Sequence, residues 1–441
     1  MAPRTTAQFD FRTKGDGFRQ ISVVQKYKNA LRFPQWYFSM TSRRTFLAAA
    51  AVPLLATAQS GPPKRIAAVI TEYRHNSHAD VIIGKYLEGF LQNRQPPGPR
   101  SKIVSMYTAQ VPKNDMSRDM ASKYNVLIYP TIWETLTGGG DRLNVDGVLL
   151  IGEHGDYPTN EKGQHLYPRY ELFLEITDVF RGTKSSVPVF NDKHLSYSWL
   201  KAKRMVEISR ELQFPLMAGS SIPVSYRPQG VDLEWGAKAK HAVSIFYADP
   251  DAYGFHNLEG LQCMVERRHG GETGVKAVQY MEKQAMWNWV AQTPWAEKLL
   301  DAALGQAIHR KPGEIRQLGK DDYVFRVEYR DGLEAAAFMM NGVAEDAATA
   351  VAVEGRSEPV ATLMWLQEGA PFQHFGCLVQ QVEKMFESGK PTYPVERTLL
   401  TSGILEAAIN SKFENGKRIE TPHLKVEYTA PRKSFFCTKK F

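Results

Sequence analysis

The pattern of apolar residues in the first half of the chain alternates between two kinds of segment. From Lys64 to Pro223, short apolar runs alternate with amphipathic segments of helical length, which is typical of parallel strands joined by crossover helices. The predicted strands are Ile66–Ile70, Ile103–Tyr107, Val148–Ile151, Val187–Phe190 and Leu216–Ala218, and the predicted helices are Ala79–Leu91, Met116–Lys123, Tyr170–Phe180 and Ser198–Gln213. The sequence therefore predicts an α/β, Rossmann-like parallel-sheet domain over residues 61–225.

Beyond Pro228 the apolar positions alternate with polar ones and include more aromatic and β-branched residues, which favours an antiparallel sheet with one open face. The predicted strands are Ala242–Tyr247, Gly274–Glu282, Tyr323–Arg330, Ala335–Asn341, Ala348–Val353 and Ala361–Gln367, with helices at Glu259–Arg267, Gln373–Ser388 and Thr398–Asn410. We expect an α+β domain with an open-faced, mostly antiparallel sheet over residues 226–430, followed by a tail over 431–441. Ligands commonly bind in a cleft between two such domains.

The positive charge of the chain is concentrated near its N-terminus. The formal net charge is +8, but residues 1–58 hold nine Lys and Arg against two Asp, so the remainder is close to neutral. A near-neutral body has no general field that attracts phosphate backbones. We therefore expect no nucleic-acid partner.

The N-terminal region contains the features of an export signal. Arg43 and Arg44 precede the apolar run Phe46–Ala56, and the small residues Ala56-Thr57-Ala58 follow. This arrangement resembles a twin-arginine signal peptide, and the run is shorter than the roughly 20 residues that span a bilayer. We expect a signal peptide over residues 40–60, a non-structural extension over 1–39, no stable membrane anchor, and a periplasmic or secreted location.

The three cysteines, Cys263, Cys377 and Cys437, are widely spaced and form no metal-ligand pattern. This spacing predicts no disulfide framework, and we expect the first two to be small buried hydrophobic residues.

The turn after the first predicted strand differs from a dinucleotide-binding turn. In such folds, glycines let the backbone approach the pyrophosphate at a helix N-terminus. Here the turn contains Tyr73-Arg74-His75-Asn76-Ser77-His78, without glycine, and no Asp or Glu ends the second strand to bind the adenine ribose. These departures predict that the cofactor contact has been rebuilt or lost.

Several segments nevertheless follow one another in a familiar order. They are Ala121–Val126, Val145–Ile151, Val187–Leu195, Gly254–Glu259 and Arg397–Ala408. In order and spacing they resemble the Gfo/Idh/MocA group of sugar and cyclitol oxidoreductases, over about residues 64–428. The resemblance implies NAD or NADP as cofactor, a carbohydrate-type small molecule as substrate, and a homo-oligomer formed through the open sheet.

The resemblance also implies a pair of catalytic residues. Asp192-Lys193-His194 stands at the family's "E-K-P" segment and Gly254–Glu259 at its "G-x-H-x-x-D" segment, so Lys193 and His256 are implied to flank the reacting carbinol. The chemistry is consistent, because an imidazole can take the hydroxyl proton and a lysine can stabilise the oxyanion. The alternatives are a solvated Lys193 and a His256 that only binds backbone at a helix start.

Polar residues follow each predicted parallel strand and should converge at one edge of the sheet. We expect Asp192, His194, Glu259, His154 and Asp156 to bind substrate. We expect Arg74, His75, Asn76, His78 and Glu153 to bind the cofactor. A divalent metal held by His75, His78, His154 and His194 is the alternative.

Three functional hypotheses follow. The first is an exported Gfo/Idh/MocA-like enzyme, an NAD(P)-dependent oxidoreductase acting on a sugar or sugar-derived alcohol. The second is a metal-assisted carbohydrate lyase or hydrolase, and the third is a non-catalytic binding protein. Trp287, Trp289 and Trp295 either stack on sugar rings or, for the first two, mark an edge strand.

Overall fold

The parallel sheet forms as the apolar runs predict. The computed structural model describes residues 61–90, 98–367 and 369–440, so the predicted extension and signal peptide lie outside the described residues. Six parallel strands pair in the order β3-β2-β1-β4-β5-β6. They are β1 (Arg65–Ile70), β2 (Lys102–Thr108), β3 (Leu127–Ile128), β4 (Gly147–Ile151), β5 (Val189–Asp192) and β6 (Leu216–Gly219).

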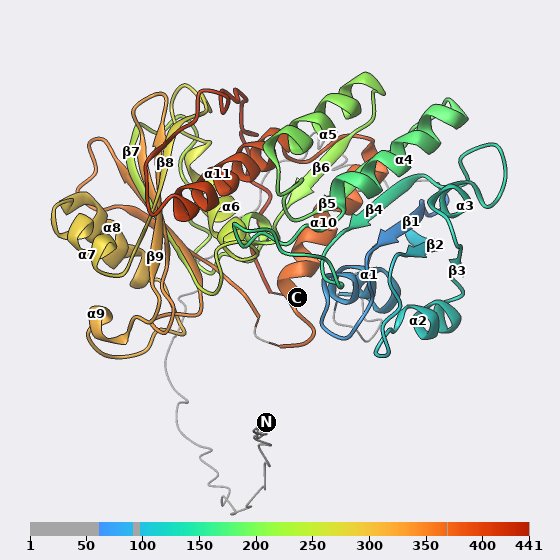
Figure 1. Cartoon of the computed structure of the whole chain (residues 1–441), viewed down its shortest axis with the longest axis horizontal. Coiled ribbons are helices and arrows are strands. Elements are labelled where there is room, and N and C mark those ends of the chain that lie inside the picture. Colours follow the sequence, from blue (N-terminus) through green and yellow to red (C-terminus); the bar gives the residue numbers. More distant parts are fainter. Residues whose placement is uncertain (1–60, 91–97, 368, 441) are drawn as a thin grey trace, which may run out of the picture. The chain divides into compact units, whose positions relative to one another are not determined.

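Helices cover both faces of this sheet (Figure 1). They are α1 (His78–Glu88), α2 (Ser117–Tyr124), α3 (Ile132–Thr137), α4 (Arg169–Thr183) and α5 (Trp199–Glu211), followed by the short η1 (Ile222–Val224). One face packs on α3, α4 and α5, and the other packs on α1 and α2. Because both faces are covered, strands such as β1 are almost continuously apolar, as parallel strands usually are.

The second sheet is mixed and mostly antiparallel, with the order β12-β11-β7-β10-β9-β8-β13. Only the β10–β7 pair is parallel among its described pairs. Its strands are β7 (Ala239–Phe246), β8 (Val275–Glu282), β9 (Tyr323–Tyr329), β10 (Glu334–Met339), β11 (Ala347–Val353), β12 (Val360–Met364) and β13 (Ile419–Glu420). Together the two sheets give the predicted fold class.

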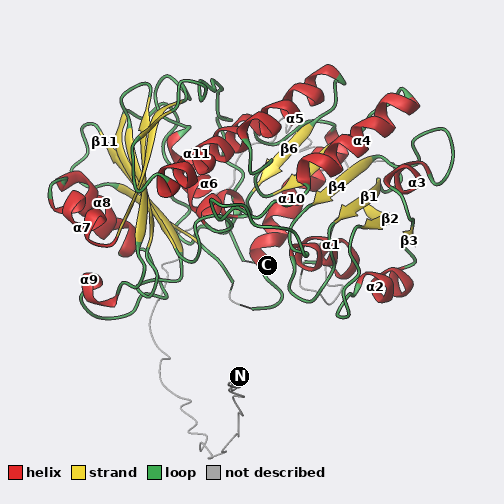
Figure 2. Ribbon diagram, viewed as in Figure 1, coloured by secondary structure: helices red, strands yellow, loops and turns green. Residues whose placement is uncertain are grey.

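Helices lie on both sides of the second sheet as well (Figure 2). Those in this part of the chain are α6 (Gly254–Val265), α7 (Lys283–Ala291), α8 (Pro294–Leu304), α9 (Ile315–Leu318), α10 (Gln373–Ser388) and α11 (Val395–Phe413). Along β10, Ala337 packs toward α6 and α11, whereas Ala336 and Phe338 pack toward α7 and α8. The face that was predicted to be open is thus covered by α7 and α8. The homo-oligomer was predicted to form through an open face of this sheet, and α7 and α8 pack on that face. The oligomeric state itself stays a prediction.

The tryptophans of this region lie in helices rather than in an edge strand. Trp287 and Trp289 belong to α7, and Trp289 contacts Trp295 at a ring-centroid distance of 5.7 Å. They pack partly buried against the cluster that joins α7 and α8 to the sheet. The alternation at Trp287 and Trp289 left an edge strand as one of two interpretations, but the face of the sheet that Met286 and Val290 cover stabilises a helix.

The last helices return to the parallel sheet. Residues of α10 belong to the apolar cluster that contains α1, and α11 packs on both α5 and α6. Because these helices connect the two sheets, the part of the chain from residue 61 onward forms one compact unit. The boundary near residue 225 separates the two sheets, while α11 packs on strands of both. No helix within the described ranges is long and apolar enough to cross a membrane.

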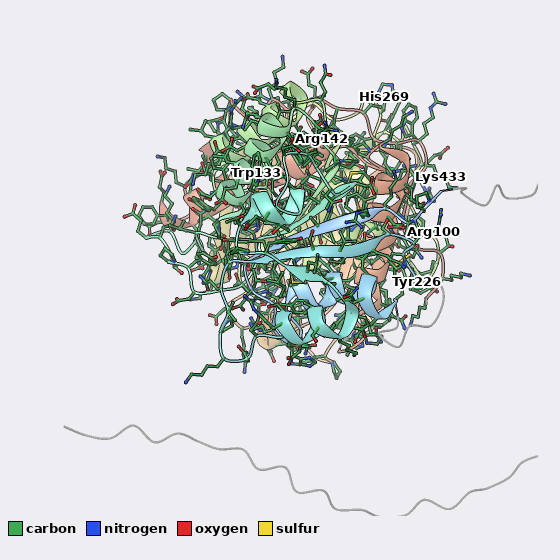
Figure 3. The ribbon with its side chains drawn as sticks, turned by 90° about the vertical axis from the view of Figure 1, so that its right-hand side faces the viewer. Arg100, Trp133, Arg142, Tyr226, His269 and Lys433 are labelled. Atoms are coloured by element: carbon green, nitrogen blue, oxygen red, sulfur yellow. A yellow bond between two sulfur atoms is a disulfide. The ribbon has the colours of Figure 1, made fainter. Side chains whose placement is uncertain are left out.

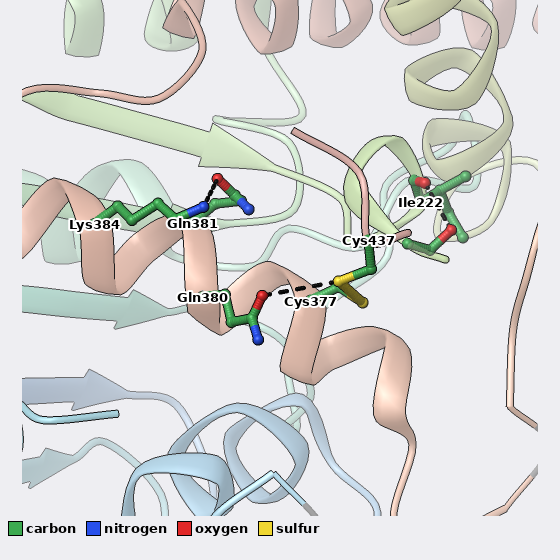
Figure 4. The surroundings of a disulfide bond; sticks show 7 residues. Ile222, Cys377, Gln380, Gln381, Lys384 and Cys437 are labelled. Carbon is green, nitrogen blue, oxygen red and sulfur yellow. Dashed lines mark hydrogen bonds between the residues drawn. A yellow bond between two sulfur atoms is a disulfide. The ribbon is translucent and has the colours of Figure 1, made fainter. Parts of the chain in front are cut away.

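Two of the cysteines form a disulfide, contrary to the prediction. Cys377 on α10 is bonded to Cys437 in the C-terminal tail, 60 residues away (Figure 4). Cys263 is a buried free thiol, as predicted. Spacing along the chain could not show the pair, because the tail folds back over α10 only in the tertiary structure.

Candidate functional site

A cavity of about 510 Å³ lies beside the carboxyl ends of β1, β4, β5 and β6, next to α6 and the start of α10. Crevices at this edge of an open parallel sheet are the usual ligand sites of such folds. Its titratable lining residues are His78, Glu153, His154, Tyr167, Lys193, Tyr247, Tyr253, His256 and His374.

Lys193 enters the cavity directly after β5. Its backbone has a φ of 62°, in the left-handed region, and its N–H donates to the carbonyl of Gly219 at 3.2 Å. This conformation directs the side chain toward β4, where Nζ donates to Glu153 Oε1 at 2.8 Å. The side chain is only 4% exposed, so the structure excludes a solvated Lys193.

Glu153, which follows β4, is paired with two cations. Besides Lys193, its carboxylate accepts a hydrogen bond from the fully buried Arg169 at the start of α4. Burial opposes ionisation of Glu153, but Lys193 and Arg169 outweigh it and hold the pKa of its carboxyl well below the ordinary value. The three side chains form a buried ionic network with two positive charges and one negative charge.

His256 lies in the first turn of α6 and is 8% exposed. Its Nδ1 is 2.6 Å from Ser220 Oγ, the residue after β6. Burial, together with the nearby Lys193, lowers the pKa of His256 well below its ordinary value, so the ring is neutral. A side-chain hydroxyl, not backbone, therefore fixes this histidine.

His78 faces His256 from the N-terminus of α1. The two rings are stacked with centroids 6.2 Å apart, and His78 Nδ1 is 2.6 Å from Asp192 Oδ2. The ring of His154 lies 5.6 Å from that of His78, and burial lowers the pKa of His154 to about 3. The cavity therefore contains several imidazoles beside Lys193.

Hydrogen bonds to side chains of the turn itself hold the segment between β1 and α1. The carboxylate of Asp80 accepts from the N–H of Asn76 at 2.9 Å, and Ser77 Oγ accepts from the N–H groups of Arg74 and Asp80. These bonds hold the Asp80 carboxylate in the first turn of α1, at the end of a helix where a phosphate would bind. Arg74 is engaged by Glu72 at 2.6 Å. The residues of this turn do not fit a dinucleotide pyrophosphate in its usual position.

The segments after β2 and β4 are also joined across the end of β1. Gln110 accepts from the N–H of Asp156 at 2.8 Å and donates to its carbonyl at 3.1 Å. No lining residue of the cavity, within the described part of the chain, comes from the segment after β2. The cavity thus stops short of the place where adenosine binds in a Rossmann fold.

The structure brings some of the predicted site residues together. Lys193, His256, His154, His78, Asn76 and Glu153 line the cavity. The others lie elsewhere. Asp192 stands behind His78, His194 is buried against Arg169, Glu259 binds Thr398 and Thr401 on α11, Asp156 and His75 are exposed, and Arg74 pairs with Glu72.

The metal alternative is not supported by this arrangement. His75 is 75% exposed at its side chain, and His194 is buried with its Nε2 3.1 Å from Arg169. Within the described ranges, no group of three or more His, Cys, Asp or Glu is placed to hold a metal ion.

Several lining residues had no sequence signal that could identify them. Tyr167 lies in the loop before α4, while Phe375 and His374 belong to α10, more than a hundred residues beyond α6. Only the return of the chain to the first sheet places them here. Ser220 was recognisable as a polar residue after a strand, but its contact with His256 was not.

Comparison with known proteins locates the fold. No family model matches the chain, and no curated protein matches it. Among solved structures, GenD2 from gentamicin A biosynthesis, in complex with NAD, is 15% identical, with 82% of this chain and 97% of GenD2 covered at a TM-score of 0.52. Myo-inositol 2-dehydrogenase from Lactobacillus plantarum is 12% identical, with coverages of 81% and 99% and a TM-score of 0.49. Myo-inositol dehydrogenase from Lactobacillus casei, in complex with NAD(H) and myo-inositol, is 10% identical, with coverages of 81% and 96% and a TM-score of 0.49. The chain shares the two-sheet fold of GenD2.

Proposed function

We propose that the chain is an exported oxidoreductase that acts on a sugar or sugar-derived alcohol, with Lys193 and His256 at the reacting carbinol. One observation carries the proposal. Lys193 follows β5 of the first sheet, and His256 lies on α6, which follows β7 of the second sheet. Both side chains nevertheless line the same cavity. The pairing matches the positions that the resemblance implied, and the fold shared with GenD2 supports it.

The cavity suits a polyhydroxylated substrate. Its lining combines hydrogen-bonding groups, such as Glu153 and Gln367, with the aromatic rings of Phe246, Tyr253 and Phe375. Polar groups fix hydroxyls, while aromatic faces cover the C–H faces of a sugar or cyclitol ring. Lys193 stabilises an alkoxide at the carbinol oxygen.

The hydride acceptor in this proposal is NAD or NADP, the cofactor that the resemblance implies. GenD2 was solved in complex with NAD. Because the β1–α1 turn does not fit the pyrophosphate, other groups of the chain would have to hold the nucleotide.

That misfit favours a second candidate function. The Asp80 carboxylate at the start of α1 and the closed link between Gln110 and Asp156 favour an enzyme that moves protons without redox change. Such an enzyme is a carbohydrate lyase or hydrolase that relies on side-chain acids and bases rather than on a metal. A binding protein without catalysis is the third hypothesis.

The nucleotide content of the purified protein separates these candidates. Denaturation should release NAD(H) or NADP(H), or titration with NAD⁺ should give saturable heat, if the first candidate is right. Absence of both, combined with turnover of a carbohydrate without a nucleotide, supports the second. Lys193→Ala and His256→Ala should each reduce turnover at least about a hundredfold. Full activity of both variants would refute the catalytic assignment.

Export is supported by the disulfide. Disulfides persist in oxidising compartments and are rare in the cytosol, and Cys377 is joined to Cys437. The replacement of Arg43 and Arg44 by lysine should retain the precursor in the cytoplasm, as cell fractionation and immunoblotting would show. Unchanged export of that variant would refute a twin-arginine route.

A further inference from the structure

We propose that His78, held by Asp192, is the base of this site, and that His256, held by Ser220, is the hydrogen-bond donor that faces it. The inference rests on the proposed function only for its substrate class, a hydroxylated small molecule. It differs from the role that the resemblance gives His256, because the base is assigned to a residue of the glycine-free turn.

The contact with Asp192 determines which nitrogen of His78 is the base. His78 Nδ1 lies 2.6 Å from Asp192 Oδ2, and Asp192 is 1% exposed at the end of β5. An ionised carboxylate only accepts hydrogen bonds, so Nδ1 carries the hydrogen and Nε2 keeps its lone pair. An aspartate that binds Nδ1 in this way orients the ring and stabilises the imidazolium that forms. His78 therefore presents a basic Nε2.

The contact with Ser220 gives His256 the opposite tautomer. Ser220 Oγ accepts a hydrogen bond from the backbone N–H of Ile222 at 3.1 Å, and it lies 2.6 Å from His256 Nδ1. The oxygen accepts from Ile222, and among the described residues His256 Nδ1 is the acceptor within hydrogen-bond distance of the hydroxyl hydrogen, so we assign that hydrogen to Nδ1. The hydrogen of the neutral ring then resides on Nε2. His256 therefore presents an N–H donor.

The two imidazoles share the cavity with Lys193. Their rings stack at an interplanar angle of 22°, and His78 is wedged edge-on against Phe375 at 5.2 Å between centroids. The other titratable groups nearby include His154 after β4, His374 on α10, Tyr253, whose ring centroid lies 6.0 Å from that of His256, and Glu153, which is paired with Lys193. Neutral imidazoles held in opposite tautomers give the cavity a proton acceptor and a hydrogen-bond donor side by side.

The proposed step is a balanced proton transfer. A substrate O–H bond breaks, its proton forms a new N–H bond at His78 Nε2, and the electron pair stays on the substrate oxygen. The N–H of His256 and the ammonium of Lys193 stabilise that oxygen. Asp192 compensates the positive charge on His78. The step needs no oxidant, so it serves either candidate function of the site.

The tautomers are measured on the protein itself, without substrate. Long-range proton–nitrogen NMR of protein with labelled histidine, near pH 7.5, should show His78 with hydrogen on Nδ1 and His256 with hydrogen on Nε2. His78→Gln and His256→Gln assign the two sets of signals. His269→Gln is the control, because His269 is exposed and does not line the cavity, so its replacement should leave both sets unchanged. Figure 3 labels His269 near the edge of the molecule.

Two second-site variants test the cause of each tautomer. Asp192→Asn should move the hydrogen of His78 to Nε2, because the amide can donate to Nδ1, and Ser220→Ala should release the preference of His256. Hydrogen on Nε2 of His78 in the wild type, or on Nδ1 of His256, would overturn the proposal. Turnover of any carbohydrate found for the enzyme should fall by about 10²–10⁴ in Asp192→Asn. Correct tautomers without turnover of any carbohydrate would refute the proposed function instead.

Discussion

The replacement Glu153→Gln tests the buried ionic network most directly. Glutamine keeps the size of the side chain and an oxygen that accepts from Lys193, but removes the only negative charge within the Lys193–Glu153–Arg169 network. Lys193 Nζ lies 2.8 Å from Glu153 Oε1. At an effective dielectric constant of about 20, that pair alone corresponds to an attraction of about 6 kcal/mol.

The free energy of unfolding should fall by less than this attraction, but the fall should still be large. Burial of two cations without a counter-charge, with Lys193 4% and Arg169 0% exposed at their side chains, typically costs about 3–5 kcal/mol. Urea unfolding at pH 7, followed by tryptophan fluorescence, measures the free energy of unfolding of wild type and variant. A loss below about 1 kcal/mol would refute the idea that this network is charged and shielded from water.

A matched control and the pH dependence sharpen the test. Glu171→Gln removes a carboxylate that binds Lys201 at 2.6 Å but is 47% exposed, so its cost should stay below about 1 kcal/mol. The folded-state pKa of Glu153 is lowered by Lys193 and Arg169 in spite of burial. Its stabilisation is therefore complete above the unfolded pKa of about 4.3 and is lost as pH falls through the folded pKa. Wild type and Glu153→Gln should converge in acid.

Three further predictions concern stability, measured by the same urea assay. Cys437→Ser opens a 60-residue loop and should cost about 4 kcal/mol; an equal midpoint for the variant and the oxidised wild type would contradict the disulfide. Gly219→Ala should cost about 1–3 kcal/mol, because φ is +125° and the added Cβ would lie 2.5 Å from the Glu259 carboxylate. The control is Gly230→Ala, which should cost less, because φ is +63° and the added Cβ would have no neighbour within 4 Å. Burial raises the pKa of Asp322 to about 7, above its unfolded value of about 3.9. The wild type should thus lose stability as pH rises from about 4 through 7. The gain in unfolding free energy of Asp322→Asn over the wild type should therefore be larger at pH 8 than at pH 5. An equal difference between variant and wild type at both pH values would argue against this shift.

The first sheet was predictable because its strands are buried on both faces. The run Ile66–Ile70 is fully buried in β1, and such runs stand out in any sequence. Leu127–Ile128 was missed because β3 has only two residues and Leu127 is 57% exposed. The helices α7 and α8 were missed because what stabilises them is the apolar face of a distant sheet rather than a signal of their own.

The location of the site was also predictable, but not which side chains enter it. Parallel strands bring their carboxyl ends to one edge, so the segments that contain His78, Glu153 and Lys193 had to meet there. Whether each side chain faces the cavity depends on local backbone and packing. His75 and His78 are three residues apart, yet the helix start at Ser77 leaves the first exposed and turns the second toward Asp192.

What the sequence determined by itself is therefore the two-sheet fold, the missing glycine turn and the edge at which polar groups gather, since each depends on residues close together in the chain. Only the tertiary structure decided the pairing of Cys377 with Cys437, the covering of the second sheet, and the partners Asp192 and Ser220 that set the tautomers of His78 and His256. Those contacts join segments 36 to 114 residues apart, and periodicity along the chain carries no information about them.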